Sequence, residues 1–307
     1  MTERLYHRDA FLRAFRATVV AHAEVGGRAA VVLDATAFYP EAGGQMADHG
    51  TLGGVAVVDV QVDDAGVVRH VVDGAPPAVG DTVDGAIDWA RRRVHMALHT
   101  GQHMLSRGLL DVARAATVSS RLGETACTID VDRDGLGDRA IADAEALVNA
   151  VIDDDVAIRA WFPTAAELAA LPLRREPKVD DQIRVIAIGD AGAEFDVSPC
   201  GGTHCARSAQ VGQVRILGTE RHKGGTRVTF AAGRRARDVL AAHHDTLAAL
   251  GRAFTCGAAE VPDAVERMRK DLGELRDQVR ATQARLADAL AARALADDAP
   301  RVALAIP

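Results

Sequence analysis

Two pairs of potential metal ligands, far apart in the sequence, restrict the folds open to this chain more than any other feature. The first pair is His99 and His103, and the second is Cys200 and His204. Residues four apart on a helix project from one face, so the two histidines of the first pair can bind one ion together. Two glycines within the second pair let the backbone turn tightly. The fold must therefore bring a helix and a glycine-containing turn together.

The chemistry of these side chains favours zinc. One thiolate and three imidazoles suit zinc better than magnesium or calcium, which prefer oxygen ligands. We therefore predict one zinc site formed by His99, His103, Cys200 and His204. A zinc metalloprotease would carry a glutamate directly after the first histidine, and Thr100 stands there instead. Because four protein ligands ordinarily close a zinc site, the ion is either structural, or loosely held by one ligand, or able to expand its coordination.

The other cysteines and a nearby histidine fit different roles. Cys205 directly follows the second ligand pair, and it should point away from the ion if its neighbour points inward. Cys127 and Cys256 fit small core residues better than ligands. We interpret His95, one helical turn before the first pair, as a surface histidine, with a role beside the metal or the substrate as the alternative.

Composition indicates a globular chain without a membrane segment. Its 307 residues are 48% hydrophobic and 26% charged, which is enough for two or three domains with buried cores. No window approaches the roughly 18 apolar residues that a membrane span requires, so we expect a soluble, cytoplasmic protein without a membrane partner. Four scattered cysteines argue against a disulfide framework.

The charge distribution gives a mixed indication about nucleic acid. A formal net charge of −7 argues mildly against such a partner, because phosphate contacts need local Lys and Arg. Between Arg207 and Arg237, however, Glu220 is the only acidic side chain among eight basic ones. This basic stretch is either an electrostatic footprint for a nucleic acid or an ordinary solvated surface.

Periodicity predicts an α+β chain whose first two parts carry the strands. Residues 1–88 contain short Val-rich runs bounded by turn residues, which predicts a small β-barrel. Residues 89–232 begin with a helix over Arg91–Leu110 and include an amphipathic helix near Asp138–Ile152, so we expect a second, α+β domain that carries the zinc. The expected strands are Ala29–Leu33, Gly54–Gln61, Val67–Val72, Ala126–Val131, Val156–Trp161 and Ile183–Ile188.

Helical spacing returns near the C-terminal end of the chain. From Val265 to Ala289, apolar residues recur at intervals of three and four, which is a heptad seam. A similar seam precedes a break at Thr255–Pro262, so residues 233–297 fit an antiparallel helical hairpin, with a homodimer through these helices as the rival. Residues 298–307 look like a strand without a partner, and we expect them to begin a further domain.

Several motifs together resemble one known family. They are His99-Thr100-Gly101-Gln102-His103-Met104-Leu105, Cys200-Gly201-Gly202-Thr203-His204, Phe38-Tyr39-Pro40-Glu41-Ala42-Gly43-Gly44-Gln45 with Asp48 and Gly50, Thr117–Gly123 and Lys223–Val228. In this order, over about residues 30–240, they resemble the editing domain of alanyl-tRNA synthetase and its free-standing relatives, the AlaX proteins. Ala42 departs from the pattern, because many free-standing members have a glycine there.

The resemblance implies a hydrolase that cleaves the ester between a wrong amino acid and alanine tRNA, with Zn²⁺ as cofactor. The chain reaches the barrel directly from Met1 without an aminoacylation domain, so the expected activity is trans-editing. Serine is the expected wrong amino acid, because it exceeds alanine only by a hydroxyl, which an apolar pocket rejects poorly. Zinc would then either activate a water molecule or anchor the amino group of the substrate.

By the same resemblance, four residues are candidates for substrate binding. Thr36 is the candidate for a hydrogen bond to the serine hydroxyl, and Gly43, Gly44 and Gln45 should shape the pocket. No carboxylate stands at a spacing that identifies a general base. Two alternatives stay open: a non-catalytic tRNA-binding module with a structural zinc, and editing of serine on threonine tRNA.

Overall fold

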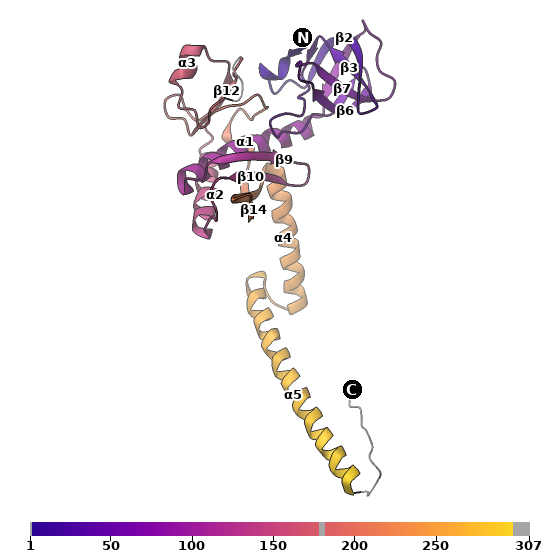
Figure 1. The fold of residues 1–307 in the computed structure, drawn as a ribbon, viewed down its shortest axis with the longest axis vertical. Helices are drawn as coiled ribbons and strands as arrows, with labels where there is room; N and C mark the ends of the chain where they lie inside the picture. Colours follow the sequence, from indigo (N-terminus) through magenta and orange to yellow (C-terminus); the bar gives the residue numbers. More distant parts are fainter. Residues whose placement is uncertain (1, 178–181, 297–307) are drawn as a thin grey trace. The chain divides into compact units, whose positions relative to one another are not determined.

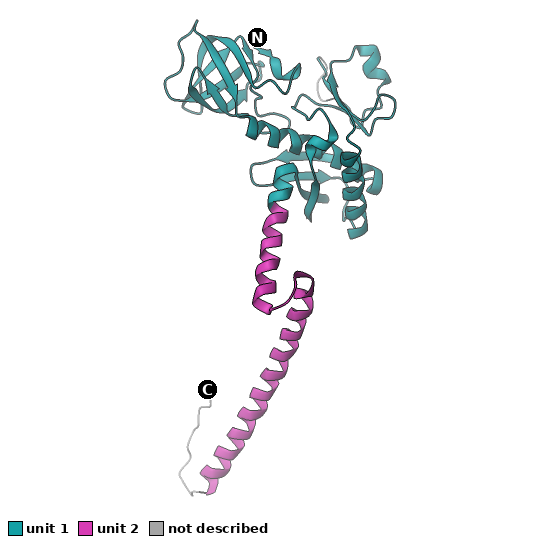
Figure 2. Cartoon of the chain, turned by 180° about the vertical axis from the view of Figure 1, so that it is seen from behind, with its two compact units in different colours: residues 1–238 teal, residues 239–307 magenta. Residues whose placement is uncertain are grey.

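The computed structural model of the chain describes residues 2–177 and 182–296, which form the α+β arrangement drawn in Figure 1. Residues 1–238 form one compact unit and residues 239–307 a second, coloured teal and magenta in Figure 2. The expected start of a further domain at 298–307 lies outside the described residues.

Six strands of the first unit close into a barrel, in the order β2-β3-β7-β6-β5-β8. Their bounds are β2 Ala14–Val25, β3 Arg28–Leu33, β5 Gly50–Leu52, β6 Val55–Val62, β7 Val68–Asp73 and β8 Thr82–Ile87. Every neighbouring pair is antiparallel, and side chains alternate between the two faces, so that one face fills the barrel with apolar residues such as Leu33, Leu52 and Val60. The predicted barrel is confirmed.

Two short strands, one before β2 and one after β3, pair with each other and thereby hold the N-terminus beside the barrel. β1 (Glu3–Arg4) pairs in parallel with β4 (Ala35–Thr36), and a 3-10 helix follows at Leu5–His7. Tyr6 in this turn is buried against the ring of Tyr39, at a centroid distance of 5.3 Å. The N-terminal turn is thereby packed against the loop that follows β4.

Helix α1 (Trp89–Ala113) is joined to the barrel through a buried ion pair. Asp88 caps the helix by accepting a hydrogen bond from the backbone of Arg91. Arg92, in the first turn, is fully buried, and its Nε donates to both carboxylate oxygens of Asp48 at 2.9 and 3.0 Å. Removing one partner of a buried ion pair typically costs about 3–5 kcal/mol. This pair therefore makes the orientation of α1 depend on the barrel.

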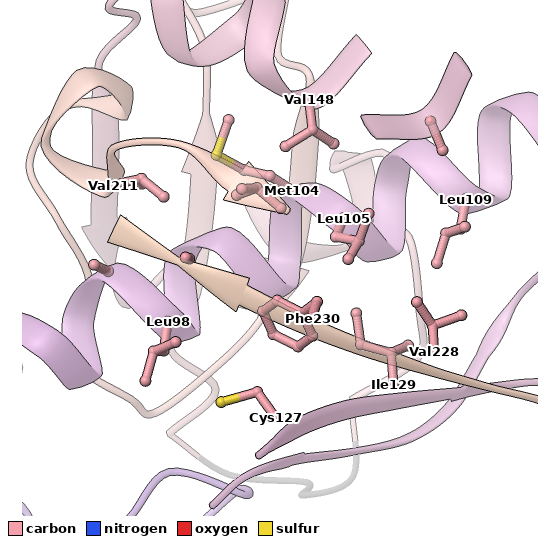
Figure 3. Packing of buried hydrophobic residues seen from close by; sticks show 14 of the residues in the cluster. Leu98, Met104, Leu105, Leu109, Cys127, Ile129, Val148, Val211, Val228 and Phe230 are labelled. Atoms are coloured by element: carbon pink, nitrogen blue, oxygen red, sulfur yellow. The ribbon is translucent and has the colours of Figure 1, made fainter. Parts of the chain in front are cut away.

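The core of the α+β part lies between α1 and a four-stranded sheet of order β14-β15-β10-β9. The elements are β9 Thr117–Leu122, β10 Cys127–Val131, α2 Asp138–Asp153, β14 Val214–His222 and β15 Gly225–Ala232. Figure 3 shows Leu98 and Leu105 of α1 facing Phe230, Ile129 and Val228 of the sheet. One apolar face of α1 is thus fixed on the sheet, as the helical spacing predicted.

A smaller sheet delivers the second ligand pair. Its order is β11-β12-β13, with β11 Ile158–Trp161, β12 Val185–Ile188 and β13 Asp196–Pro199, and the short helix α3 (Ala165–Ala170) lies between β11 and β12 in the chain. All residues of β12 and β13 are buried, and β13 contacts α1. The segment that begins at Cys200 follows this buried strand directly. It therefore starts beside α1, the helix that carries His99 and His103.

The C-terminal helices are α4 (Gly233–Phe254) and α5 (Val261–Ala296). Pro262 stands in the first turn of α5, where its missing N–H costs nothing. The heptad residues Met268, Leu272, Leu275, Val279 and Leu286 are 46–56% exposed. The helices are confirmed, while their packing as an antiparallel hairpin and a homodimer through them stay predictions. No helix in the described part of the chain combines the length and the apolar character needed to cross a membrane.

Candidate metal centre

The four predicted ligands lie together. His99 and His103 project from one face of α1, and Cys200 and His204 come from the segment after β13. One ligand atom of each side chain lies within 4.8 Å of all the others, so that the cluster could hold a metal ion. Cys200 Sγ is 3.4 Å from His99 Nε2 and 3.3 Å from His204 Nε2.

The other ring nitrogen of His99 is held by Gln45. His99 Nδ1 donates to Gln45 Oε1 at 2.7 Å, which leaves the lone pair of Nε2 directed at the cluster. Gln45 is fully buried, and it also bonds Thr203, accepting from its backbone N–H at 3.2 Å and donating to its hydroxyl at 2.8 Å. One amide side chain thus connects the loop after β4, helix α1 and the second ligand segment.

The Nδ1 atoms of His103 and His204 also lie next to oxygen atoms of other side chains. His103 Nδ1 lies 3.4 Å from Asp196 Oδ2, a carboxylate that also accepts from Arg174 Nε at 2.6 Å. His204 Nδ1 lies 3.2 Å from Thr100 Oγ1, to which it donates in the tautomer that keeps Nε2 free. Each imidazole therefore has its Nδ1 beside an oxygen and its Nε2 turned to the centre, as is usual for histidines that bind metal.

The surrounding charges favour the ionised forms of the Cys200 thiol and of the Asp196 carboxyl group. Burial would raise the pKa of Cys200, but the three surrounding imidazoles outweigh it and hold that pKa well below its usual range. Burial would likewise raise the pKa of Asp196, and the nearby ring of His103 and the charge of Arg174 lower it instead. A thiolate is the form of cysteine that binds metal. A thiolate with three imidazole nitrogens is a donor set that fits zinc.

One glycine of the second segment is required by the packing of His99. A Cβ built on Gly202 would lie 2.2 Å from His99 Cε1 and 2.4 Å from its Nδ1. A Cβ on Gly201 would meet only His7 Nε2, at 3.9 Å. The two glycines, equivalent in the sequence, therefore have different roles: Gly202 makes room for a ligand ring and Gly201 faces open space.

A pocket of about 1060 Å³ opens beside the cluster. Its walls include His99 and Cys200 from the cluster, Gly43 from the loop after β4, and Arg184. Four aromatic or imidazole side chains also line it, namely Tyr6, His7, Tyr39 and Phe162. Burial lowers the pKa of His7 to about 4, so its ring is neutral at pH 7. The cluster is therefore accessible from a cavity large enough for a small-molecule ligand.

The predicted substrate-binding residues are placed differently from one another. Gly43 lines the pocket, whereas Thr36, Gly44 and Gln45 are not among the residues that line it. Thr36 is fully buried, and its hydroxyl donates to His70 Nε2 at 2.8 Å and accepts from the backbone of Phe38 at 3.1 Å. A Cβ on Gly44, whose φ is +86°, would lie 2.7 Å from the carbonyl oxygen of Ser120. Gly44 thus packs against β9.

Two interpretations of nearby residues can be compared with the structure. Cys205 is buried in the apolar core and lies outside the ligand cluster, as expected. The interpretation of His95 as a surface residue is wrong, because it is 1% exposed and its Nδ1 has no hydrogen-bond partner in the described part of the chain. His95 lies four residues before His99 on α1, and this face of the helix is turned inward.

The basic stretch between Arg207 and Arg237 is largely paired. Five of its side chains form ion pairs with acidic residues, namely Arg207 with Asp155, Arg215 with Glu145, Arg221 with Asp134, Arg227 with Asp130 and Arg234 with Asp238. Four of these acids come from earlier parts of the sequence, so their effect was not visible in the local composition. The net positive field of this surface is smaller than the sequence indicated.

Two family descriptions match parts of the chain. "tRNA synthetases class II (A)" matches residues 9–91, and "Threonyl and Alanyl tRNA synthetase second additional domain" matches residues 183–229. The first match covers the barrel and the start of α1, and the second includes Cys200 and His204. These two segments, which contain the barrel and the second ligand pair, are therefore similar to parts of aminoacyl-tRNA synthetases.

Individual relatives narrow this class. The alanyl-tRNA editing protein AlaX-L of Pyrococcus horikoshii is 34% identical over 244 residues, 77% of this chain and 59% of that protein. Alanine–tRNA ligases of Halobacterium salinarum and Pyrobaculum neutrophilum are 34% and 35% identical, over 91% and 76% of this chain and 31% and 27% of those proteins. The chain belongs to the family that this editing protein and this part of the ligases share, and the resemblance drawn from the motifs is confirmed. It spans about three fifths of the editing protein and about a third of the ligases.

Proposed function

We propose that this chain hydrolyses the ester of mischarged alanine tRNA, chiefly seryl-tRNA(Ala), at a zinc site formed by His99, His103, Cys200 and His204. The observation that carries the proposal is the convergence of three Nε2 atoms and one thiolate on a point beside a large pocket. The similarity to an alanyl-tRNA editing protein supports the choice of substrate. A cytoplasmic location, where the tRNA is found, belongs to the same proposal, and the four free cysteines agree with it.

When bound, zinc supplies a Lewis acid that polarises the ester carbonyl or lowers the pKa of a water molecule. The protein's own residues hold the ligands in place: Gln45, Asp196 and Thr100 fix the orientation of the three imidazoles. His7 is a weak base at neutral pH because its pKa lies at about 4. Its neutral ring can nevertheless accept a hydrogen bond from a water molecule in the pocket.

Selection of serine is proposed for the loop residues Gly43, Gly44 and Gln45, and the predicted role of Thr36 is tested separately by Thr36→Val. Gly43 has the strongest support, because it lines the pocket. Thr36 has the weakest, because its hydroxyl proton is already donated to His70 within the barrel. A hydrolytic site that hydrogen-bonds the serine hydroxyl can spare the alanyl ester, which lacks that group.

Two alternatives make different predictions. A tRNA-binding module with a structural zinc would bind tRNA without hydrolysing the ester. Editing of seryl-tRNA(Thr) is favoured by one observation, namely that the family description matched at residues 183–229 covers threonyl as well as alanyl synthetases.

The test is a deacylation assay on seryl-tRNA(Ala), alanyl-tRNA(Ala) and seryl-tRNA(Thr), with zinc and after chelation. We expect rapid, zinc-dependent hydrolysis of the first substrate only. Cys200→Ala should abolish hydrolysis and leave tRNA binding in a gel-shift assay nearly intact, whereas Cys256→Ala, the matched control in the second unit, should change neither. Equal losses of binding and hydrolysis in Cys200→Ala would favour the structural-zinc module.

A further inference from the structure

Arg92, Arg174 and Arg184 all have buried side chains, and two of them are neutralised by a carboxylate. Arg92 is bonded to both oxygens of Asp48, and Arg174 Nε donates to Asp196 at 2.6 Å. This is the usual arrangement, because charged side chains are rarely buried unless they are paired. These two residues provide the reference for the third.

Arg184 has no such partner. It is 5% exposed, and no carboxylate of residues 2–177 or 182–296 lies within ion-pair distance of its guanidinium. Its Nη1 donates to the backbone oxygens of Cys200 at 3.2 Å and Gly202 at 2.8 Å, while its Nε has no hydrogen-bond partner in the part of the chain that the structure describes. One N–H group of a buried guanidinium is therefore left without an acceptor among the described residues.

The position of Arg184 indicates where the missing anion comes from. Burial lowers its pKa, and Cys200 is the largest of the influences that oppose this shift. A guanidinium nevertheless stays protonated at neutral pH. The thiolate of Cys200 is shared with any metal held by the cluster, so it does not remain available to neutralise Arg184. Arg184 lines the same pocket as Cys200 and His99, and the anion can enter through that pocket.

The pocket is large enough for more than an amino acid. Its volume of about 1060 Å³ is at the upper end of the range for small-molecule sites. Its wall carries charges of both signs, because it also includes Arg4, Arg8 and Arg175 together with Glu3, Asp64 and Glu176. Arg184 differs from the rest in being a buried cation without a carboxylate partner within the described ranges. A guanidinium presents a planar fork of N–H donors that matches the geometry of an oxyanion.

We propose that Arg184 binds an oxyanion of the substrate inside this pocket. The proposal deepens the proposed function and rests on it, since the substrate is taken to be an aminoacyl ester of tRNA. Two parts of that substrate offer the chemistry. One is the phosphate of the terminal nucleotide. The other is the carbonyl oxygen of the ester, which becomes negative when water adds to the carbonyl carbon and the π electrons move to that oxygen. As the carbonyl re-forms, the bond to the ribose oxygen breaks, and that oxygen takes a proton derived from the water.

The experiment compares Arg184→Met and Arg184→Lys with the wild-type chain. Arg139→Met is the matched control, because Arg139 is 91% exposed on α2 and away from the pocket. For each protein, zinc content, the affinities for 5′-AMP and adenosine by calorimetry, and kcat and KM on seryl-tRNA(Ala) are measured. Loss of a charge-assisted hydrogen bond should lower binding or rate by about 10- to 100-fold in Arg184→Met, with full zinc content.

These measurements distinguish the two sources of the oxyanion, the phosphate and the ester. If the phosphate is bound, Arg184→Met raises KM and loses the preference of the wild type for AMP over adenosine. If the carbonyl oxygen of the ester is bound as it becomes negative, kcat falls while KM and the AMP preference stay the same. Either result supports the proposal. A loss of zinc in proportion to the loss of activity would overturn it, and would make Arg184 a support for the segment at Cys200. Unchanged values in every arm would overturn it as well.

Two further outcomes are covered by the same design. If Arg184→Met does not fold, Arg184→Lys keeps the charge without the planar fork and should show a loss of about 10-fold at full zinc content. If the wild type hydrolyses none of the esters, the proposed function fails, and the AMP arm alone decides on Arg184. A wild-type preference for AMP that disappears in Arg184→Lys would then support anion binding, and equal affinities for AMP and adenosine would refute it.

Discussion

His70 in the barrel and the three histidines at the metal centre are all buried in the first unit, but they use their ring nitrogens differently. In the barrel, His70 Nδ1 donates to the backbone oxygen of Val31 at 3.1 Å, and Nε2 accepts from Thr36. Both nitrogens are satisfied within the protein. At the metal centre, each imidazole has an oxygen beside Nδ1, and the Nε2 atoms converge on one point. Burial is common to both sites, and the convergence of the nitrogens distinguishes the ligands. A free nitrogen alone does not, because His95 is buried with an Nδ1 that is unpartnered in the ranges that the structure describes, and it lies outside the cluster.

The strongest test of this comparison exchanges one histidine from each set for glutamine. His99→Gln should weaken zinc binding by more than about 100-fold. Mutation of a residue that only hydrogen-bonds to a metal ligand typically costs about 10- to 100-fold in affinity, and loss of the ligand itself should cost more. His70→Gln should leave zinc affinity unchanged and lower the stability of the barrel. Competition with a zinc indicator and urea unfolding measure the two quantities. Zinc lost from both variants would mean that the barrel histidine supports the metal centre.

The second prediction uses acid. Burial lowers the pKa of His70 to about 4, from an ordinary value of 6.5. Between these values the unfolded chain binds a proton that the folded chain does not, so stability falls as pH decreases from 6.5 to 4 and is fully present above 6.5. The contribution of His70 is about 3 kcal/mol. His70→Gln should remove this part of the slope of unfolding free energy against pH. The other buried histidines contribute equally to both proteins, and identical slopes would contradict the prediction.

The third prediction separates the two glycines of the second ligand segment. Gly202→Ala places a Cβ 2.2 Å from His99 Cε1, so we expect the ring to move and zinc affinity to fall by about 100-fold. Gly201→Ala meets only His7 at 3.9 Å and should bind zinc as the wild type does. Isothermal titration of the metal-free proteins measures both. Similar affinities for the two variants would show that His99 can bind from another position.

The fourth prediction concerns the partner of His99. Gln45→Met removes the oxygen that accepts from His99 Nδ1, and it should lower zinc affinity by about 10-fold or more. Gln102→Met is the matched control, because this buried amide on α1 donates to Ser106 and has no contact with a ligand nitrogen. Cobalt substitution would follow the change in ligand geometry by visible absorption. An unaltered cobalt spectrum in Gln45→Met would remove Gln45 from the support of the metal centre.

The smallest effect on the reaction is expected at Thr36. Thr36→Val keeps the shape and removes both the donor to His70 and the acceptor for the backbone N–H of Phe38, so stability should fall by about 1–3 kcal/mol. Because that hydroxyl is already used in the barrel, we expect the ratio of seryl-tRNA to alanyl-tRNA hydrolysis to stay the same. A ratio that shrinks by about 10- to 100-fold would instead return Thr36 to serine recognition.

The sequence predicted features that depend on local spacing. The alternation of strands, the helical periodicity of α1 and the four-residue spacing of each ligand pair are properties of short segments, and they predicted the barrel, the helices and the ligand cluster. The bonds around the ligands depend on the folded chain. Gln45 and Thr203 are separated by 158 residues, and Thr100 and His204 by 104. No spacing rule connects such residues, so the bonds of Gln45 to His99 and Thr203 were not predicted.

Thr36 illustrates the same limit within the barrel. Its bond to His70 depends on the pairing of β3 with β7, in which Val31 lies opposite His70. A shift of one residue in this register would turn His70 to the other face of the sheet. The sequence predicted both strands, but it did not contain their register. A signal was present all the same, since a histidine in a strand of buried valines needs a polar partner.

The buried pair of Arg92 and Asp48 limits the positions at which genetic recombination can divide this chain. A recombination point between the barrel and α1, near residue 88, would leave each fragment with a buried charge whose partner had been lost. Among the residues that the structure describes, a point after residue 238 separates no buried ion pair, and it follows the end of the first compact unit. Genetic exchange between proteins should therefore transfer residues 1–238 as one piece, and the two halves of that piece should share one evolutionary history.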